Sequence, residues 1–97
     1  MKETDQIMGE MMSVVRFGIE AEAFLASPLG KYLQQRVDAE VVEAVNSLKT
    51  VDPCDHAQIV KLQNEIYRAE SFSAWLADLI TSGWEAEKEI RMMEGNL

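Results

Sequence analysis

The sequence has few of the residues that build catalytic, metal-binding or disulfide-bonded sites. Among its 97 residues it has one cysteine, Cys54, one histidine, His56, and two prolines. A single cysteine excludes an internal disulfide and a zinc site built from cysteines, and a single histidine excludes a histidine-rich metal site. The glycine-rich and serine-centred motifs of nucleotide-binding proteins and hydrolases are also absent. We therefore expect no enzyme, no metal and no cofactor.

Positive charge is scarce as well. Nine lysines and arginines accompany 17 acidic residues, so the formal net charge is −8. No segment is basic, which argues against direct binding of nucleic acid. No run approaches the ~20 apolar residues that a membrane-spanning helix needs. We expect a cytoplasmic protein with no membrane partner, whose acidic surface suits a basic protein partner or the imitation of nucleic acid.

The sequence is rich in helical periodicity, above all in one stretch. Residues 53–82 are expected to form a long helix, with Asp52 as its N-cap, Pro53 at its first position and Gly83 just past its end. Within it, apolar and small residues recur at alternating spacings of three and four, the pattern of a packed helix face. These residues are Ile59, Leu62, Ile66, Ala69, Ser73, Leu76 and Ile80.

A second helix is expected over residues 28–48. Pro28 disfavours helical geometry at Ser27, which leaves the Ser27 side chain free to cap this helix. Its polar side chains, Gln34 among them, are expected on its outer face. The connection to residue 53 is short, so the two helices should form an antiparallel hairpin.

The two ends of the chain are expected to form shorter helical segments. These cover residues 7–25, weakened by Gly9 and Gly18, and residues 84–94. The predicted fold class is therefore all-α: a single helical domain over residues 1–97, with a hairpin core and oligomeric assembly.

Self-association is predicted from the unequal lengths of the hairpin helices. The longer helix extends beyond the start of the shorter one. Monomers seldom leave a large apolar patch exposed, and a symmetric oligomer buries it against its own copy. The predicted self-association residues on this extension are Leu76, Leu79, Ile80 and Trp84.

Two further groups of residues are candidate binding sites. Glu85, Glu87 and Glu89 form either a solvated helix face or a partner-binding strip that imitates phosphates. A small nucleotide-like ligand between protomers would need basic and aromatic groups. The candidates for such a site are Lys31, Tyr32, Arg36, Tyr67 and Arg68.

Arg36, one of these candidates, and the Cys54–His56 pair also have simpler interpretations. Arg36 can pair with Glu40 on its own helix. Cys54 and His56 suggest a thiolate activated at a helix N-terminus. Residues two apart on a helix do not face each other, however, which favours an ordinary capped turn.

Several segments form a distinctive block: 24–33 (FLASPLGKYL), 49–53 (KTVDP), 62–66 (LQNEI) and 68–72 (RAESF), followed by Trp75 and Leu76. Over residues 20–90 this block resembles small all-helical proteins encoded by tailed bacteriophages. The family has no assigned activity, so the resemblance transfers no catalytic residue. It implies a phage protein that acts in the cytoplasm of an infected bacterium or in the virion.

Three functions follow as hypotheses from these patterns. The first is a virion or assembly accessory. The second is an acidic inhibitor of a host nucleic-acid-handling or defence protein. Both act through protein–protein interaction, with the chain itself and a phage or host protein as partners. The alternative is an oligomeric sponge that sequesters a small nucleotide-like ligand between protomers.

Overall fold

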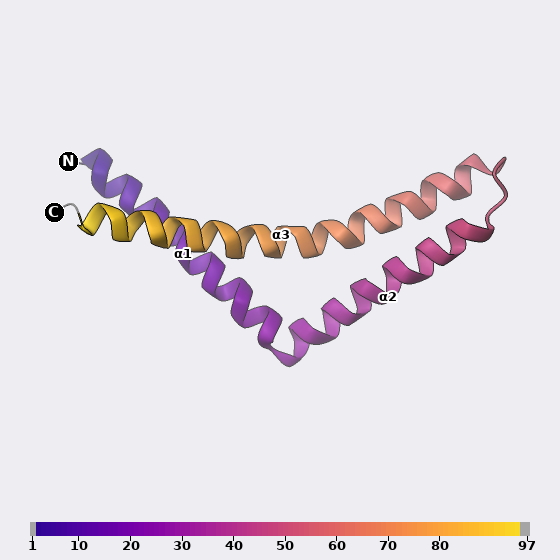
Figure 1. The fold of residues 1–97 in the computed structure, drawn as a ribbon, viewed down its shortest axis with the longest axis horizontal. Coiled ribbons are helices and arrows are strands. Elements are labelled where there is room, and N and C mark those ends of the chain that lie inside the picture. Colours follow the sequence, from indigo (N-terminus) through magenta and orange to yellow (C-terminus); the bar gives the residue numbers. More distant parts are fainter. Residues whose placement is uncertain (1, 96–97) are drawn as a thin grey trace. The chain divides into compact units, whose positions relative to one another are not determined.

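The computed structural model describes residues 2–95, and within this range it contains helices and no strand. Helix α1 spans Lys2–Ala26, α2 spans Pro28–Thr50 and α3 spans His56–Gly95 (Figure 1). The predicted all-α fold class is confirmed.

The chain divides into two compact units that share the long helix α3. Unit 1 comprises α1 and the second part of α3, from Leu76 onward. Unit 2 comprises Ser27–Trp75, and so contains α2, the connecting loop and the first part of α3.

The start of α2 has the predicted cap. Ser27 has extended backbone angles, with φ −74° and ψ 157°, and its side chain accepts a hydrogen bond of 3.0 Å from the Gly30 N–H. Pro28 occupies the first position of the helix, where a missing N–H leaves no helical bond unmade. The prediction for this boundary is confirmed.

The start of α3 lies three residues later than predicted, and its cap is a different aspartate. Asp52 Oδ1 accepts from the Cys54 N–H at 2.8 Å, and the Asp52 carbonyl accepts from the Asp55 N–H at 2.9 Å, which makes a tight turn around Pro53. Asp55 Oδ1 then accepts from the Gln58 N–H at 3.1 Å, as an N-cap does. The prediction of Asp52 as the cap is wrong, because proline fits the second position of a turn as well as the first position of a helix.

The helices at both ends of the chain are longer than predicted. Helix α3 continues through Gly83 to Gly95, so the expected helix end at residue 82 and a separate segment over 84–94 are wrong. Helix α1 begins at Lys2 and runs unbroken through Gly9 and Gly18.

In unit 1, α1 and α3 cross where two glycines meet (Figure 1). A Cβ atom placed on Gly18 would lie 2.9 Å from the Leu79 carbonyl oxygen and 3.0 Å from the Gly83 Cα. Ala21 and Ala86 are also buried. Gly83 is therefore needed for close backbone approach, and this explains why a glycine sits inside a long helix.

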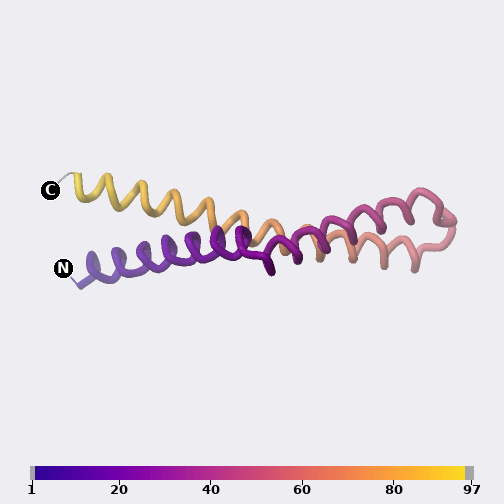
Figure 2. Tube along the Cα trace, turned by 90° about the horizontal axis from the view of Figure 1, so that it is seen from below, coloured from indigo at the N-terminus to yellow at the C-terminus, as the bar shows by residue number. Residues whose placement is uncertain are grey.

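In unit 2, α2 and the first part of α3 run along each other in opposite directions (Figures 1 and 2). Ala44, Leu62 and Ala69 are buried in this unit. A side-chain hydrogen bond of 2.9 Å joins Gln34 Nε2 to Ser73 Oγ. The expectation that Gln34 lies on the outer face is wrong, because this partly buried bond turns it toward α3.

The hydrophobic core of the described residues is thin. It consists of Leu62 and four alanines, and no large side chain in residues 2–95 is fully buried.

Candidate interaction surfaces

A groove of 730 Å³ between α2 and α3 is the main concave surface of unit 2. Val37, Ala44, Leu62 and Ala69 contribute apolar surface to it. Charged side chains of both helices also line it, three of each sign. We call this surface the charged groove, and its charged members are Arg36, Glu40 and Glu43 of α2 with Lys61, Glu65 and Arg68 of α3.

Arg36 is held in the charged groove by two neighbours on its own helix. A hydrogen bond with Tyr32 and, after it, the Glu40 carboxylate raise the pKa of the Arg36 guanidinium above its ordinary value. The Arg36 Nε and Glu40 Oε1 atoms are 3.6 Å apart, so the predicted pairing of these two residues is confirmed. Both side chains remain exposed, so the pair contributes little to stability.

The structure brings together only part of the predicted small-ligand set. Arg36 and Arg68 line the charged groove, whereas Lys31, Tyr32 and Tyr67 do not. Tyr67 lines a separate open depression on α3, which it shares with Arg68.

The charged groove also contains a basic residue that sequence reasoning missed. Lys61 lies seven residues before Arg68, and residues seven apart lie on the same side of a helix. This seven-residue spacing from Arg68 is the feature of the sequence that could have identified Lys61 as a groove residue. Three carboxylates in the same groove oppose the binding of an anionic ligand.

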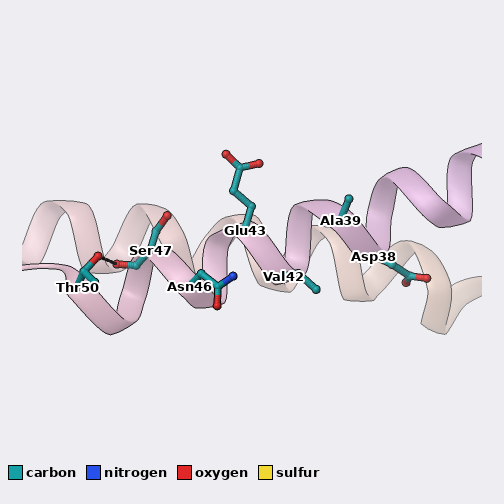
Figure 3. A pocket seen from close by; sticks show the side chains of 7 residues that line it. All are labelled: Asp38, Ala39, Val42, Glu43, Asn46, Ser47 and Thr50. Carbon is teal, nitrogen blue, oxygen red and sulfur yellow. Dashed lines mark hydrogen bonds between the residues drawn. The ribbon is translucent and has the colours of Figure 1, made fainter.

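A shallow depression follows the outer side of α2. Figure 3 shows its lining side chains projecting from this one helix, with Asp38 and Glu43 as its charged members. Thr50 Oγ1 donates to the Ser47 carbonyl at its end. The absence of a basic side chain among these lining residues, together with its open form, makes it a weak candidate for anion binding.

The predicted self-association residues all lie on the part of α3 that belongs to unit 1, but they do not share one face. Leu76 and Ile80 are half-buried, while Leu79 and Trp84 are 42% and 60% exposed. Trp84 lies five positions after Leu79, so the two side chains point about 140° apart around the helix. They therefore belong to two different flanks of unit 1.

Helix α1 adds exposed apolar side chains that the predicted site did not include. Met12, Phe17 and Ile19 are each more than half exposed. Ile19 and Trp84 line a small cleft beside the Gly18–Gly83 crossing. Close approach at the crossing buries the small residues and leaves the large ones on its flanks.

The three glutamates of the predicted acidic strip are divided between two sides of α3. Glu85 and Glu89 are exposed and four residues apart, so they share one side. Glu87 is half-buried and forms an ion pair with Arg91. A phosphate-like strip in this region therefore rests on Glu85 and Glu89 alone.

The remaining candidate chemistry is slight. Cys54 and His56 are both exposed near the start of α3. Over residues 2–95 there is no group of three or more His, Cys, Asp or Glu side chains placed to hold a metal ion. None of the helices in that range combines the length and the hydrophobicity that crossing a membrane requires.

No protein-family model, curated protein or solved structure matches this chain.

Proposed function

We propose that this chain is a non-enzymatic phage protein that self-associates and inhibits a basic host protein of nucleic-acid handling or defence. It acts in the cytoplasm of the infected bacterium. The observation that carries the proposal is the combination of a thin core with an acidic charge concentrated in unit 1.

Self-association is supported by the surface that the chain leaves exposed. A pair of helices buries one seam, and the other sides of both helices face water. Large apolar side chains of both units, such as Phe17, Leu29 and Trp75, are each more than half exposed, and another copy of the chain could remove this surface from water. In this proposal the helical hairpin of residues 28–75 is completed by another copy of the chain.

The charge of the two units supports a basic partner. The described residues of unit 1 carry four basic and ten acidic side chains, a net charge of −6, while unit 2 carries five basic and seven acidic, a net charge of −2. An acidic field of this kind raises the association rate with a basic surface and repels nucleic acid. Exposed apolar side chains in the same unit, such as Trp84, would supply the short-range contacts.

A competition experiment tests this function. The wild-type chain is used as bait in lysate of a bacterial host, and captured proteins are released with duplex DNA. We expect a DNA-binding or DNA-processing protein that DNA displaces. Glu85→Lys with Glu89→Lys should weaken its capture at least tenfold, because two like charges then face a basic surface.

The matched control places the same change in unit 2. Asp38→Lys with Glu70→Lys gives the same net charge at exposed sites of unit 2 and should leave capture near the wild-type level. Equal loss with both variants would indicate a nonspecific charge effect and contradict the assignment to unit 1. Recovery of the protein in purified virions, without a host partner, would instead support the accessory function.

The ligand sponge is kept as a second candidate because Arg36, Lys61 and Arg68 line one groove. Titration calorimetry with cyclic and linear nucleotides tests it. We expect no heat of binding, because Glu40, Glu43 and Glu65 line the same groove. Micromolar binding that is lost in Arg68→Ala would favour the sponge.

A further inference from the structure

We propose that the charged groove of unit 2 is the interface between two copies of this chain, related by a two-fold axis. The inference rests on the self-association proposed above and assigns it to a different face from the extension that carries Leu79 and Trp84. In the dimer, α2 and the first part of α3 of each copy pack as four antiparallel helices.

The charges of the groove can complement those of a second copy. Its lining contains three basic and three acidic side chains, and so has no net charge. On α2, Arg36 lies one turn before Glu40 and two turns before Glu43. A two-fold axis that crosses the groove near Glu40 reverses its direction, so Arg36 of one copy lies against Glu43 of the other.

Exposed apolar side chains lie beside the end of the groove that contains Arg36 and Arg68. Leu29 and Tyr32 lie seven and four residues before Arg36, on the same side of α2, and are 61% and 57% exposed. Trp75 lies seven residues after Arg68 on α3 and is 68% exposed. Tyrosine and tryptophan are the residues that most often dominate the binding energy of protein interfaces.

Unit 1, in contrast, is a poor match for its own copy. A two-fold interface places the same surface on both sides, so two units of charge −6 would face each other. Like charges across an interface cost affinity. Unit 2, with a net charge of −2 and a neutral groove, does not have this obstacle.

Two variants with opposite charge changes test the interface. In the first, Lys61→Glu and Arg68→Glu make the groove predominantly acidic, with Arg36 as its remaining basic side chain. In the second, Glu40→Lys and Glu43→Lys make it predominantly basic. By light scattering with size-exclusion chromatography at tens of micromolar, each variant alone should be monomeric, with self-affinity lowered on the order of 100-fold. An equimolar mixture should restore the dimer, because the two grooves are then complementary.

A control variant separates the groove from total charge. Lys31→Glu with Lys49→Glu brings the chain to −12, the same net charge as Lys61→Glu with Arg68→Glu, at exposed positions outside the groove. It should remain dimeric. Leu79→Glu, on the flank of unit 1, should also remain dimeric. Circular dichroism checks that each variant stays helical.

The outcomes separate this inference from the function on which it rests. If the wild-type chain is monomeric, both the groove interface and the proposed self-association are overturned. If Leu79→Glu dissociates the oligomer and the groove variants do not, the charged groove is not the interface. Self-association itself would still hold in that case. If charge reversal unfolds the chain, Lys61→Gln with Arg68→Gln replaces it, and wild-type self-affinity in that variant also overturns the groove.

Discussion

Units 1 and 2 are both pairs of helices that share α3, yet they are held together by different means. In unit 1 the two backbones approach each other at Gly18 and Gly83, and the buried residues beside them are alanines. In unit 2 the contact is made by side chains, with Leu62 buried and Gln34 bonded to Ser73. Backbone contact depends on the absence of side-chain atoms, so unit 1 should be the less tolerant of substitution at its contact.

The same two units also differ in charge. Unit 1 has a net charge of −6 and unit 2 of −2 over the described residues. We infer a division of roles, in which unit 1 contacts a basic partner and unit 2 contacts a second copy. An acidic surface attracts a basic partner and repels its own copy.

The largest expected effect on stability comes from adding one methyl group at the glycine crossing. Gly18→Ala places a Cβ 2.9 Å from the Leu79 carbonyl oxygen, and backbone atoms there cannot rotate away. Overpacking of this kind costs about 1–3 kcal/mol. Urea unfolding should show the loss, and hydrogen exchange should show it first in the amides of α1.

Gly9→Ala is the matched control for that change. Gly9 lies in the same helix, and a Cβ there would meet nothing within 4 Å. Alanine should therefore stabilise the chain at this position by up to about 1 kcal/mol, through helix propensity alone. Stabilisation by both substitutions would mean that α1 and α3 do not approach closely at Gly18.

The second effect concerns the cap at the start of α3 and therefore unit 2. Asp55→Ala removes the acceptor of the Gln58 N–H and should cost about 1 kcal/mol. Asp52→Ala removes only an exposed turn bond to the Cys54 N–H and should cost less, about 0.5 kcal/mol. The difference is measured by thermal unfolding of the two variants side by side. A larger loss of stability in Asp52→Ala than in Asp55→Ala would identify Asp52 as the N-cap of α3, as the sequence pattern predicted.

The ends of α2 and α3 show which helix boundaries can be predicted from the sequence and which cannot. Ser27 before Pro28 could be identified as a cap, because a proline at the first helical position fixes which residue precedes it. Asp52 and Asp55 are both good caps, and the choice depends on a turn around Pro53 that spacing does not reveal. Gly83 has the same difficulty, since a glycine past a helix end and a glycine at a close crossing look alike until the partner helix is placed.

For the candidate sites too, contacts within one helix could be predicted from the sequence, and contacts between two helices could not. The pairing of Arg36 with Glu40 was predictable, because both residues lie on one helix at a spacing of four. The charged groove was not, because it requires the register between α2 and α3. The loop over residues 51–55 sets that register, and the sequence pattern had placed part of this loop in a helix.

The smallest expected effect tests the side-chain bond that distinguishes unit 2. Ser73→Ala removes the 2.9 Å bond to Gln34, whose side chain keeps its bond to Asp38. Because the bond is only partly buried, the loss should be about 0.5 kcal/mol, at the low end for a hydrogen bond.

Ser71→Ala, two residues away on α3, is the matched substitution. The Ser71 hydroxyl donates to the Tyr67 carbonyl of its own helix and makes no bond to α2 in the described structure. Alanine is the better helix former, so this change should stabilise the chain by a few tenths of a kcal/mol. Ser73→Ala receives the same gain in helix propensity, so it should leave the chain about 0.5 kcal/mol less stable than Ser71→Ala does, with a correspondingly lower urea midpoint. A shift of the same sign and size in both would mean that the Gln34–Ser73 bond contributes nothing to stability, and that unit 2, like unit 1, depends on packing alone.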